Sequence, residues 1–266
     1  MTVAMGDDVQ NGEAVMLDRD RLAADLHGAV ERGEIVAYYQ PQLDIDTRRI
    51  VSAEALSRWV HPELGIILPG NFIPLAEEIG LISDIGDHMI ALSCQSAAAW
   101  AHNGTPIEVA VNVSGIQLRD AGFSERLISA MRAAQLNPQF LTIEVTESIE
   151  IIDVSTVAER LDWLRSVGVT ISVDDFGTGH SSVEQVLDLR ATELKIDQAL
   201  VRNDSMAARV LLAAVVTFAH DKGLRVVAEG VETEEQLARM RELRCDRAQG
   251  YLLGMPMPKP EFDRLL

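Results

Sequence analysis

From residue 17 onward, two spacings of apolar positions alternate along the chain. Residues 17–33 have apolar side chains three or four positions apart and end at a glycine, which predicts an amphipathic helix. Short runs rich in aliphatic and β-branched residues predict strands. The predicted strands span residues 34–44, 49–59, 107–114, 140–148, 169–176, 193–197, 225–232 and 248–254. The remaining predicted helices span residues 71–104 (in two segments), 123–136, 154–168, 182–189, 206–223, 233–244 and 259–266.

Eight predicted strands, most of them followed by a helix, predict an α/β fold with a mostly parallel sheet. At this chain length the pattern favours a TIM-like (β/α)8 barrel formed by residues 18–266 as one domain. The turn at residues 45–48 is too short for a crossover helix, so the first two strands should pair antiparallel. We therefore expect an irregular start, with one of these two strands antiparallel. Residues 1–17 are polar, and we expect a flexible leader there.

Polar side chains stand at the end of almost every predicted strand, although strands buried on both faces should be apolar. Taken singly, each has a structural explanation, such as capping a helix or binding a backbone group. Active sites of (β/α)8 barrels lie at the carboxyl ends of the strands, so we expect these side chains to converge on one rim. They are Glu54, Asn112, Glu144, Asp174, Asp175, Lys195, Glu229 and Gln249.

The carboxylates among these residues cannot share a partly buried site as bare anions, and must take up protons or cations. Because no Cys or His is among them, their oxygens favour hard cations such as Mg²⁺ or Mn²⁺. The adjacent Asp174 and Asp175 suit a pair of ions. Two ions about 3.5–4 Å apart stabilise the attacking and leaving oxygens of a phosphoester displacement.

The net charge of −18, from 23 basic and 41 acidic residues, argues against binding of a nucleic-acid polymer. An anionic ligand would need bound cations or a few well-placed basic residues. No apolar run approaches the roughly 18 residues of a membrane span, so we expect no membrane insertion. Cys94 and Cys245 form no CxxC motif, which is typical of a reduced, cytoplasmic protein.

The order of several motifs resembles the EAL domain family of cyclic di-GMP phosphodiesterases. The tripeptide Glu54-Ala55-Leu56 lies in a long matching stretch, residues 38–82. It is followed in order by VNVSGIQL, IEVTES, VDDFGTGHSS, LKID, VVAEGVET and QGYLLGMPMP. The resemblance covers roughly residues 18–266 and implies metal-dependent hydrolysis of cyclic di-GMP to linear pGpG by a metal-activated water.

Roles for individual residues follow from the resemblance, position by position. Glu54, Asn112, Glu144 and Asp174 resemble the ligands of a first Mg²⁺ or Mn²⁺ ion, and Asp174 and Asp175 those of a second.

The resemblance also assigns residues to the reacting water and to the substrate. Lys195 resembles the lysine that contacts the nucleophilic water, and Glu229 the acid that orients or deprotonates it. Glu147 resembles the glutamate that anchors the loop after the two aspartates. Substrate-binding or supporting positions are Gln40, Leu56, Arg58 and Gln249, with Arg58 resembling a phosphate contact.

The resemblance further implies inhibition by Ca²⁺, whose looser coordination would misplace the nucleophile. It also implies a homodimer through the face near the DDFG loop, where His180 replaces the usual Tyr. Two alternatives stay open. One is a catalytically silent EAL domain that acts as a cyclic di-GMP receptor or protein-interaction module. The other is a barrel enzyme of metal-assisted enolisation, which also gathers carboxylates and a lysine at strand ends.

Overall fold

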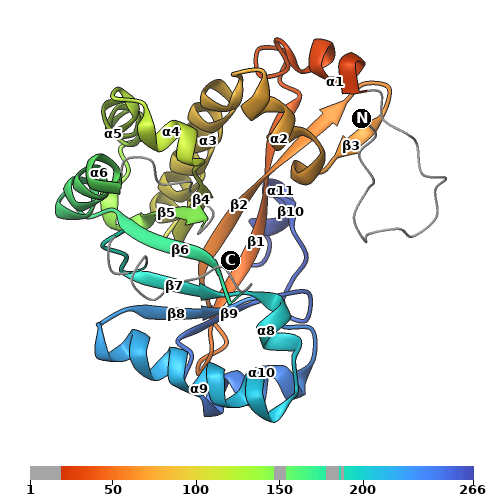
Figure 1. Cartoon of the computed structure of the whole chain (residues 1–266). Coiled ribbons are helices and arrows are strands. Elements are labelled where there is room, and N and C mark those ends of the chain that lie inside the picture. Colours follow the sequence, from red (N-terminus) through yellow and green to blue (C-terminus); the bar gives the residue numbers. More distant parts are fainter. Residues whose placement is uncertain (1–18, 147–153, 178–185, 187–188) are drawn as a thin grey trace.

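Eight strands close into a barrel in the computed structural model, which describes residues 19–146, 154–177, 186 and 189–266 (Figure 1). The order around the barrel is β1-β9-β8-β7-β6-β5-β4-β2, and the pairing of β1 with β2 closes it. The strands are β1 (Ile35–Asp44), β2 (Ile50–His61), β4 (Glu108–Asn112), β5 (Leu141–Thr146), β6 (Thr170–Phe176), β7 (Glu193–Ile196), β8 (Arg225–Ala228) and β9 (Arg247–Gln249).

The irregular start of the barrel is confirmed. β1 pairs antiparallel with both of its barrel neighbours, β2 and β9, whereas every pairing from β2 through β4 to β9 is parallel. The reversed strand is therefore β1. The carboxyl ends of the other seven strands meet on one rim of the barrel.

Two short strands were not predicted. β3 (Gly65–Ile67) pairs antiparallel with the end of β2, and β10 (Met257–Pro258) pairs with Tyr38 and Tyr39 of β1. The β1–β2 hairpin thus extends well beyond the barrel toward β3 and α1 (Figure 1). Both strands are too short to produce a period-two pattern in the sequence.

Helices cover the outside of the barrel, and α9 and α10 lie outside β8 and β9 (Figure 1). The predicted helix over residues 71–104 is confirmed as two segments. The predicted helix over residues 182–189 lies almost entirely outside the described residues. The helices are α1 (Arg19–Leu26), α2 (Pro69–Glu78), α3 (Ile82–His102), α4 (Gly115–Arg119), α5 (Phe123–Ala134), the 3₁₀ turn η1 (Pro138–Phe140), α6 (Val154–Ser166), α8 (Gln198–Arg202), α9 (Met206–Asp221), α10 (Glu234–Glu242) and α11 (Lys259–Phe262).

The first helix is shorter than predicted. α1 ends at Leu26, and Gly28 has a φ angle of 74°, in the left-handed region that favours glycine. Residues 27–33 form turns instead of the last two helical turns expected up to Gly33. The last strand is also shorter than predicted, since β9 ends at Gln249 and turns follow.

Side chains alternate between the two faces of each barrel strand, and β4 shows what this produces. Val109 and Val111 belong to the apolar core between the barrel and its helices. Glu108 and Asn112 instead bind polar partners on other barrel strands. The barrel interior is therefore polar at both ends, and the apolar core surrounds it.

Candidate active site

Lys195 lies at the centre of the cluster at the carboxyl end of the barrel. It is on β7 and its side chain is 1% exposed. Its Nζ atom lies 2.7 Å from Glu229 Oε1, 3.0 Å from Glu144 Oε1, 3.3 Å from Asp174 Oδ2 and 3.4 Å from Glu54 Oε2. Burial alone would lower the pKa of this lysine, but the surrounding carboxylates outweigh burial and raise it well above its ordinary value. Lys195 is therefore held as a cation among four carboxyl groups.

Glu54, on β2, is held in place by two amide donors. Asn112 Nδ2 donates to Glu54 Oε1 at 2.9 Å, and Gln249 Nε2 donates to Glu54 Oε2 at 2.6 Å. Gln249 Nε2 also donates to Gln40 Oε1 at 3.0 Å, which connects β9 to β1. Burial raises the pKa of Glu54, but Lys195 and the two amides outweigh it and the net shift is downward. Glu54 is thus kept ionised in spite of its burial.

Asp174 and Asp175 reach the same site although successive side chains of a strand point to opposite faces. The register between β6 and β7 shifts between Val173 and Phe176, which marks a β-bulge. Asp175 has a φ angle of 60°, and its backbone N–H donates to Asp174 Oδ1 at 2.8 Å. Bulges re-aim side chains beside active sites, and here the bulge turns both carboxylates toward the barrel mouth. This local kink explains how two aspartates that are adjacent in sequence can both point into the site.

Three acids of the site have raised pKa values. Burial raises the pKa of Glu144 well above its ordinary value, and the nearby Glu54 adds to this against the opposing charge of Lys195. Burial likewise raises the pKa of Glu229, although Lys195 opposes it. For Asp175, burial and then the Asp174 charge raise the pKa to about 6. The single positive charge of Lys195 does not balance the negative charge that these carboxylates carry when ionised.

The donor set fits hard divalent cations. One carboxylate oxygen from each of Asp174, Asp175 and Glu229 lies within 4.8 Å of the others. Glu144 is fully buried, and apart from Lys195 Nζ, 3.0 Å from its Oε1 atom, neither of its carboxylate oxygens has a hydrogen-bond partner among the described residues. Buried, unpartnered oxygens and excess negative charge both disfavour the site without a cation. The cluster could therefore bind metal ions through oxygen ligands.

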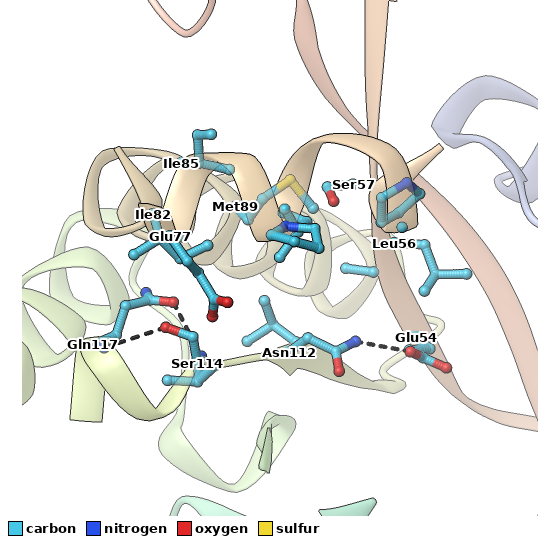
Figure 2. A pocket seen from close by; sticks show the side chains of 18 of the residues that line it. Glu54, Leu56, Ser57, Glu77, Ile82, Ile85, Met89, Asn112, Ser114 and Gln117 are labelled. Atoms are coloured by element: carbon cyan, nitrogen blue, oxygen red, sulfur yellow. Dashed lines mark hydrogen bonds between the residues drawn. The ribbon is translucent and has the colours of Figure 1, made fainter. Parts of the chain in front are cut away.

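Two cavities open on either side of the cluster and share Glu54, Leu56 and Asp175. The larger, of about 660 Å³, lies between β2, β4 and the helices α2 and α3, and its lining is mostly apolar (Figure 2). The smaller, of about 210 Å³, is lined by Gln40, Gln249 and residues that follow β7, β8 and β9. A ligand that spanned both cavities would cross the acidic cluster.

The structure brings most of the predicted site residues together. They are Glu54, Asn112, Glu144, Asp174, Asp175, Lys195, Glu229, Gln40, Gln249 and Leu56. Arg58 lies two residues beyond Leu56 on β2, with its guanidinium 5.5 Å from the centre of the Tyr38 ring, and it does not line either cavity. Glu147 and His180 lie outside the described residues.

Residues of the larger cavity were missed by the sequence reasoning. Glu77 and Gln117 lie there, on α2 and α4. The only sequence pattern at these positions was the Ser-x-x-Gln spacing of Ser114 and Gln117. This spacing is a capping box, which indicates the start of a helix rather than a ligand contact.

The fold and site define an α/β barrel with an acidic, oxygen-rich cluster at the carboxyl ends of its strands, able to bind metal ions. A sequence model of the EAL domain matches residues 23–256, and the chain belongs to the EAL domain family.

Relatives support this assignment over most of the chain. The bifunctional diguanylate cyclase/cyclic di-GMP phosphodiesterase MucR of Pseudomonas aeruginosa is 40% identical over 246 residues, which cover 91% of this chain and 36% of MucR. The cyclic di-GMP phosphodiesterase RocR of the same species is 33% identical over 241 residues, covering 90% of this chain and 62% of RocR. The chain spans about a third of the length of MucR.

A solved structure agrees with the fold. The MucR phosphodiesterase in complex with c-di-GMP superposes with a TM-score of 0.86 at 38% identity, covering 91% of this chain and 99% of that chain. Within the described part of the chain, no helix is long and apolar enough to cross a membrane.

Proposed function

We propose that this chain is a cyclic di-GMP phosphodiesterase that hydrolyses its substrate to linear pGpG with two divalent cations, Mg²⁺ or Mn²⁺. The observation that carries the proposal is the group of four carboxylates around Lys195 where two cavities meet. Membership of a family with cyclic di-GMP phosphodiesterases among its members supports the choice of substrate.

The residues suited to hold the ions are those predicted as ligands. Glu54, Asn112, Glu144 and Asp174 would hold one ion, and Asp174 with Asp175 the other. When bound, such cations lower the pKa of water and offset the charge that develops on the phosphoryl group. Asn112 and Gln249 orient Glu54 through hydrogen bonds, so the site is arranged before the ligand arrives.

The chain's own groups supply the proton chemistry. Lys195 lies 2.7 Å from Glu229 and fixes this carboxylate at the mouth, where it is suited to accept the proton of the attacking water. In the reaction the water oxygen bonds to phosphorus and the P–O3′ bond breaks. The O3′ atom leaves with a proton, and pGpG keeps the phosphate on its 5′ side.

The two cavities suit an extended dinucleotide. The shared residues Glu54, Leu56 and Asp175 lie at the junction, where the scissile phosphate would sit. The apolar larger cavity fits one nucleobase with its ribose, and the second nucleotide would extend into the smaller cavity. We expect Arg58, on the same strand as Glu54, to contact phosphate.

The direct test is incubation of the protein with cyclic di-GMP and Mg²⁺, Mn²⁺ or Ca²⁺, followed by chromatography of the nucleotides. We expect pGpG with Mg²⁺ or Mn²⁺ and none with Ca²⁺ alone, because Ca²⁺ takes a larger and looser coordination shell. Full turnover with Ca²⁺ as the only metal would refute this part of the proposal. Intact cyclic di-GMP with every metal, together with tight binding by calorimetry, would instead identify a receptor.

We also propose a homodimer formed near the DDFG loop, and a cytoplasmic location. α8 packs beside the end of β6, where Leu200 lies against Gly177, and α9 follows with the exposed apolar side chains of Met206, Val210 and Leu211. An apolar patch of this kind is typical of an interaction site. Sedimentation at several protein concentrations, with Val210→Asp as the variant, tests the dimer. A wild-type chain that stays monomeric at every concentration would contradict it.

A further inference from the structure

The interior of the barrel has a middle layer of small side chains between its two charged ends. On five strands, the side chain two residues before a polar residue of the carboxyl-end cluster points inward and is at most 1% exposed. These residues are Ser52, Ala110, Thr142, Ser172 and Val227. Ala110 and Val227 are buried but stand outside the apolar core that surrounds the barrel, which agrees with this inward direction. Because barrels of this kind are usually filled by bulky branched side chains, a layer of small ones leaves space between the two ends.

Three polar atoms of this layer are buried and have no hydrogen-bond partner in the described part of the chain. They are Ser52 Oγ, Ser172 Oγ and Gln42 Nε2. Gln42, on β1, is 1% exposed and is the Cα partner of Ser52 on β2 and of Gln249 on β9. Buried polar atoms in proteins are nearly always paired with protein groups or with ordered water, since an unpaired one is costly. An amide N–H₂ group donates and a hydroxyl both donates and accepts, so one kind of partner for all three atoms must be able to do both.

Two residues of the carboxyl-end cluster have unpaired oxygens next to the same layer. Glu144 is the Cα partner of Ser172, and its Oε2 atom has no hydrogen-bond partner among the described residues. Gln249 donates through Nε2 to two other side chains, but its buried Oε1 atom accepts no hydrogen bond from any residue that the structure describes. Cα partners on neighbouring strands lie about 4.7–4.9 Å apart, and their side chains share a face of the sheet. A small molecule between Ser172 and Glu144, or between Gln42 and Gln249, would therefore contact both side chains.

We propose that ordered water molecules fill this middle layer, bound by Ser52, Ser172 and Gln42, and that they hold Glu144 and Gln249 in place from inside the barrel. Water suits these atoms because it donates to the oxygens and accepts from the Gln42 amide, whereas a cation would be repelled by that N–H₂ group. Buried water commonly makes about three hydrogen bonds to otherwise unpaired polar groups. It would enter through the mouth of the barrel, where the two cavities open.

Ser172 is then a positioning residue of the acidic cluster. Its hydroxyl acts on Glu144 through bound water, and a hydrogen bond to the free oxygen of a metal ligand fixes the direction of that ligand. This role rests on the proposed function, which makes Glu144 a ligand, whereas the water site itself does not.

The first test asks whether the two hydroxyls are hydrogen-bonded, by thermal unfolding of Ser52→Ala and Ser172→Ala with EDTA. If water binds the hydroxyls, each variant loses hydrogen bonds and its Tm should fall by about 2–4 °C. Removing a hydroxyl that has no partner would instead raise Tm or leave it unchanged. A crystal structure at a resolution that shows ordered water gives the direct check, with density expected beside Ser52 Oγ and Ser172 Oγ. A Tm that rises or stays constant in both variants, or a barrel interior without water, would overturn the proposal.

The second test separates positioning from stability, by calorimetry with Mn²⁺ alone on the wild type, Ser172→Ala and Ser93→Ala. Ser93 is the matched control, because its hydroxyl is fully buried on α3 and donates to the Met89 backbone oxygen at 2.8 Å. We expect Ser93→Ala to lower Tm and keep the wild-type affinity for Mn²⁺, and Ser172→Ala to weaken Mn²⁺ binding about tenfold.

The outcomes of the calorimetry distinguish the two proposals. Unchanged Mn²⁺ affinity in Ser172→Ala would overturn the positioning role. If the wild type binds no Mn²⁺, the proposed two-cation site fails and the positioning role fails with it, while ordered water beside Ser52 and Ser172 would still support the interior site.

Discussion

The two ends of the barrel interior carry different balances of charge. At the amino end, Glu108 and Glu193 face Arg225 and Arg247, and each of the four is the first residue of its strand. Glu108 receives two hydrogen bonds from each arginine, at 2.6–3.2 Å. At the carboxyl end, one lysine faces four carboxylates.

The pKa values of the buried glutamates reflect this difference in charge balance. At the amino end, burial opposes ionisation, but the two guanidinium groups outweigh it and hold the pKa of Glu108 below its ordinary value. At the carboxyl end, the pKa of Glu144 is raised well above that value. A buried network whose charges balance keeps its acids ionised without further partners, whereas an unbalanced one needs protons or cations. This difference identifies the functional end better than the number of charges at either end.

The largest expected effect is on activity. Glu54→Ala removes a carboxylate that three polar side chains hold in place, and we expect kcat/KM on cyclic di-GMP to fall by more than about 100-fold, since even groups that only support metal ligands are worth about 10–100-fold. Chromatographic detection of pGpG measures it. Glu242→Ala, exposed at the end of α10, is the control and should hydrolyse normally. Substantial remaining activity in Glu54→Ala would contradict the assignment of Glu54 as a metal ligand.

The next effect is on stability, at the other end of the barrel. Glu108→Gln leaves Arg225 and Arg247 with only Glu193 between them, and an uncompensated buried charge is costly. Because the network is partly exposed to solvent, we expect a loss of about 2–3 kcal/mol in the free energy of unfolding, below the ~3–5 kcal/mol of fully buried pairs. Urea unfolding without metal measures it, with Glu242→Gln as the control. A change in the free energy of unfolding within the experimental error would show that the pairing of Glu108 with the two arginines is not needed for stability.

The same substitution at the carboxyl end should act in the opposite direction. Glu144→Gln resembles the protonated acid that the metal-free site favours, so we expect the free energy of unfolding to stay constant or rise by up to ~1 kcal/mol without metal. The stabilisation on adding Mg²⁺ should shrink, because a ligand is lost. Thermal unfolding with EDTA and with Mg²⁺ checks both. A large loss of stability in the metal-free variant would contradict the comparison of the two ends.

A feature of the fold or site could be predicted from the sequence when it depends on residues that are close together along the chain. Strands, helices and the antiparallel start depend on short-range patterns, and the site residues stand at strand ends that the fold brings to one rim. The bulge that brings Asp174 and Asp175 to the same side depends on pairing with β7 and has no local signature. Likewise the pairing of Glu108 with Arg225 joins strands that are far apart in sequence.

The smallest expected effect is a dependence of metal stabilisation on pH. Without metal, the folded-state pKa of Asp175 is about 6, above its ordinary value of 3.8, so between these values the folded chain binds more protons than the unfolded chain. The contribution of this group to stability therefore falls as pH rises through that window, and Glu144 and Glu229 act in the same direction.

Cations compete with these protons, so the increase in Tm on adding Mg²⁺ should be larger at pH 7.5 than at pH 5.0. Thermal unfolding at both pH values, with EDTA or with Mg²⁺, measures the difference. In Asp175→Asn the dependence should weaken, because the amide does not titrate, whereas Glu242→Gln should behave as the wild type. Equal increases in Tm at the two pH values would show that protons and cations do not share the acidic cluster.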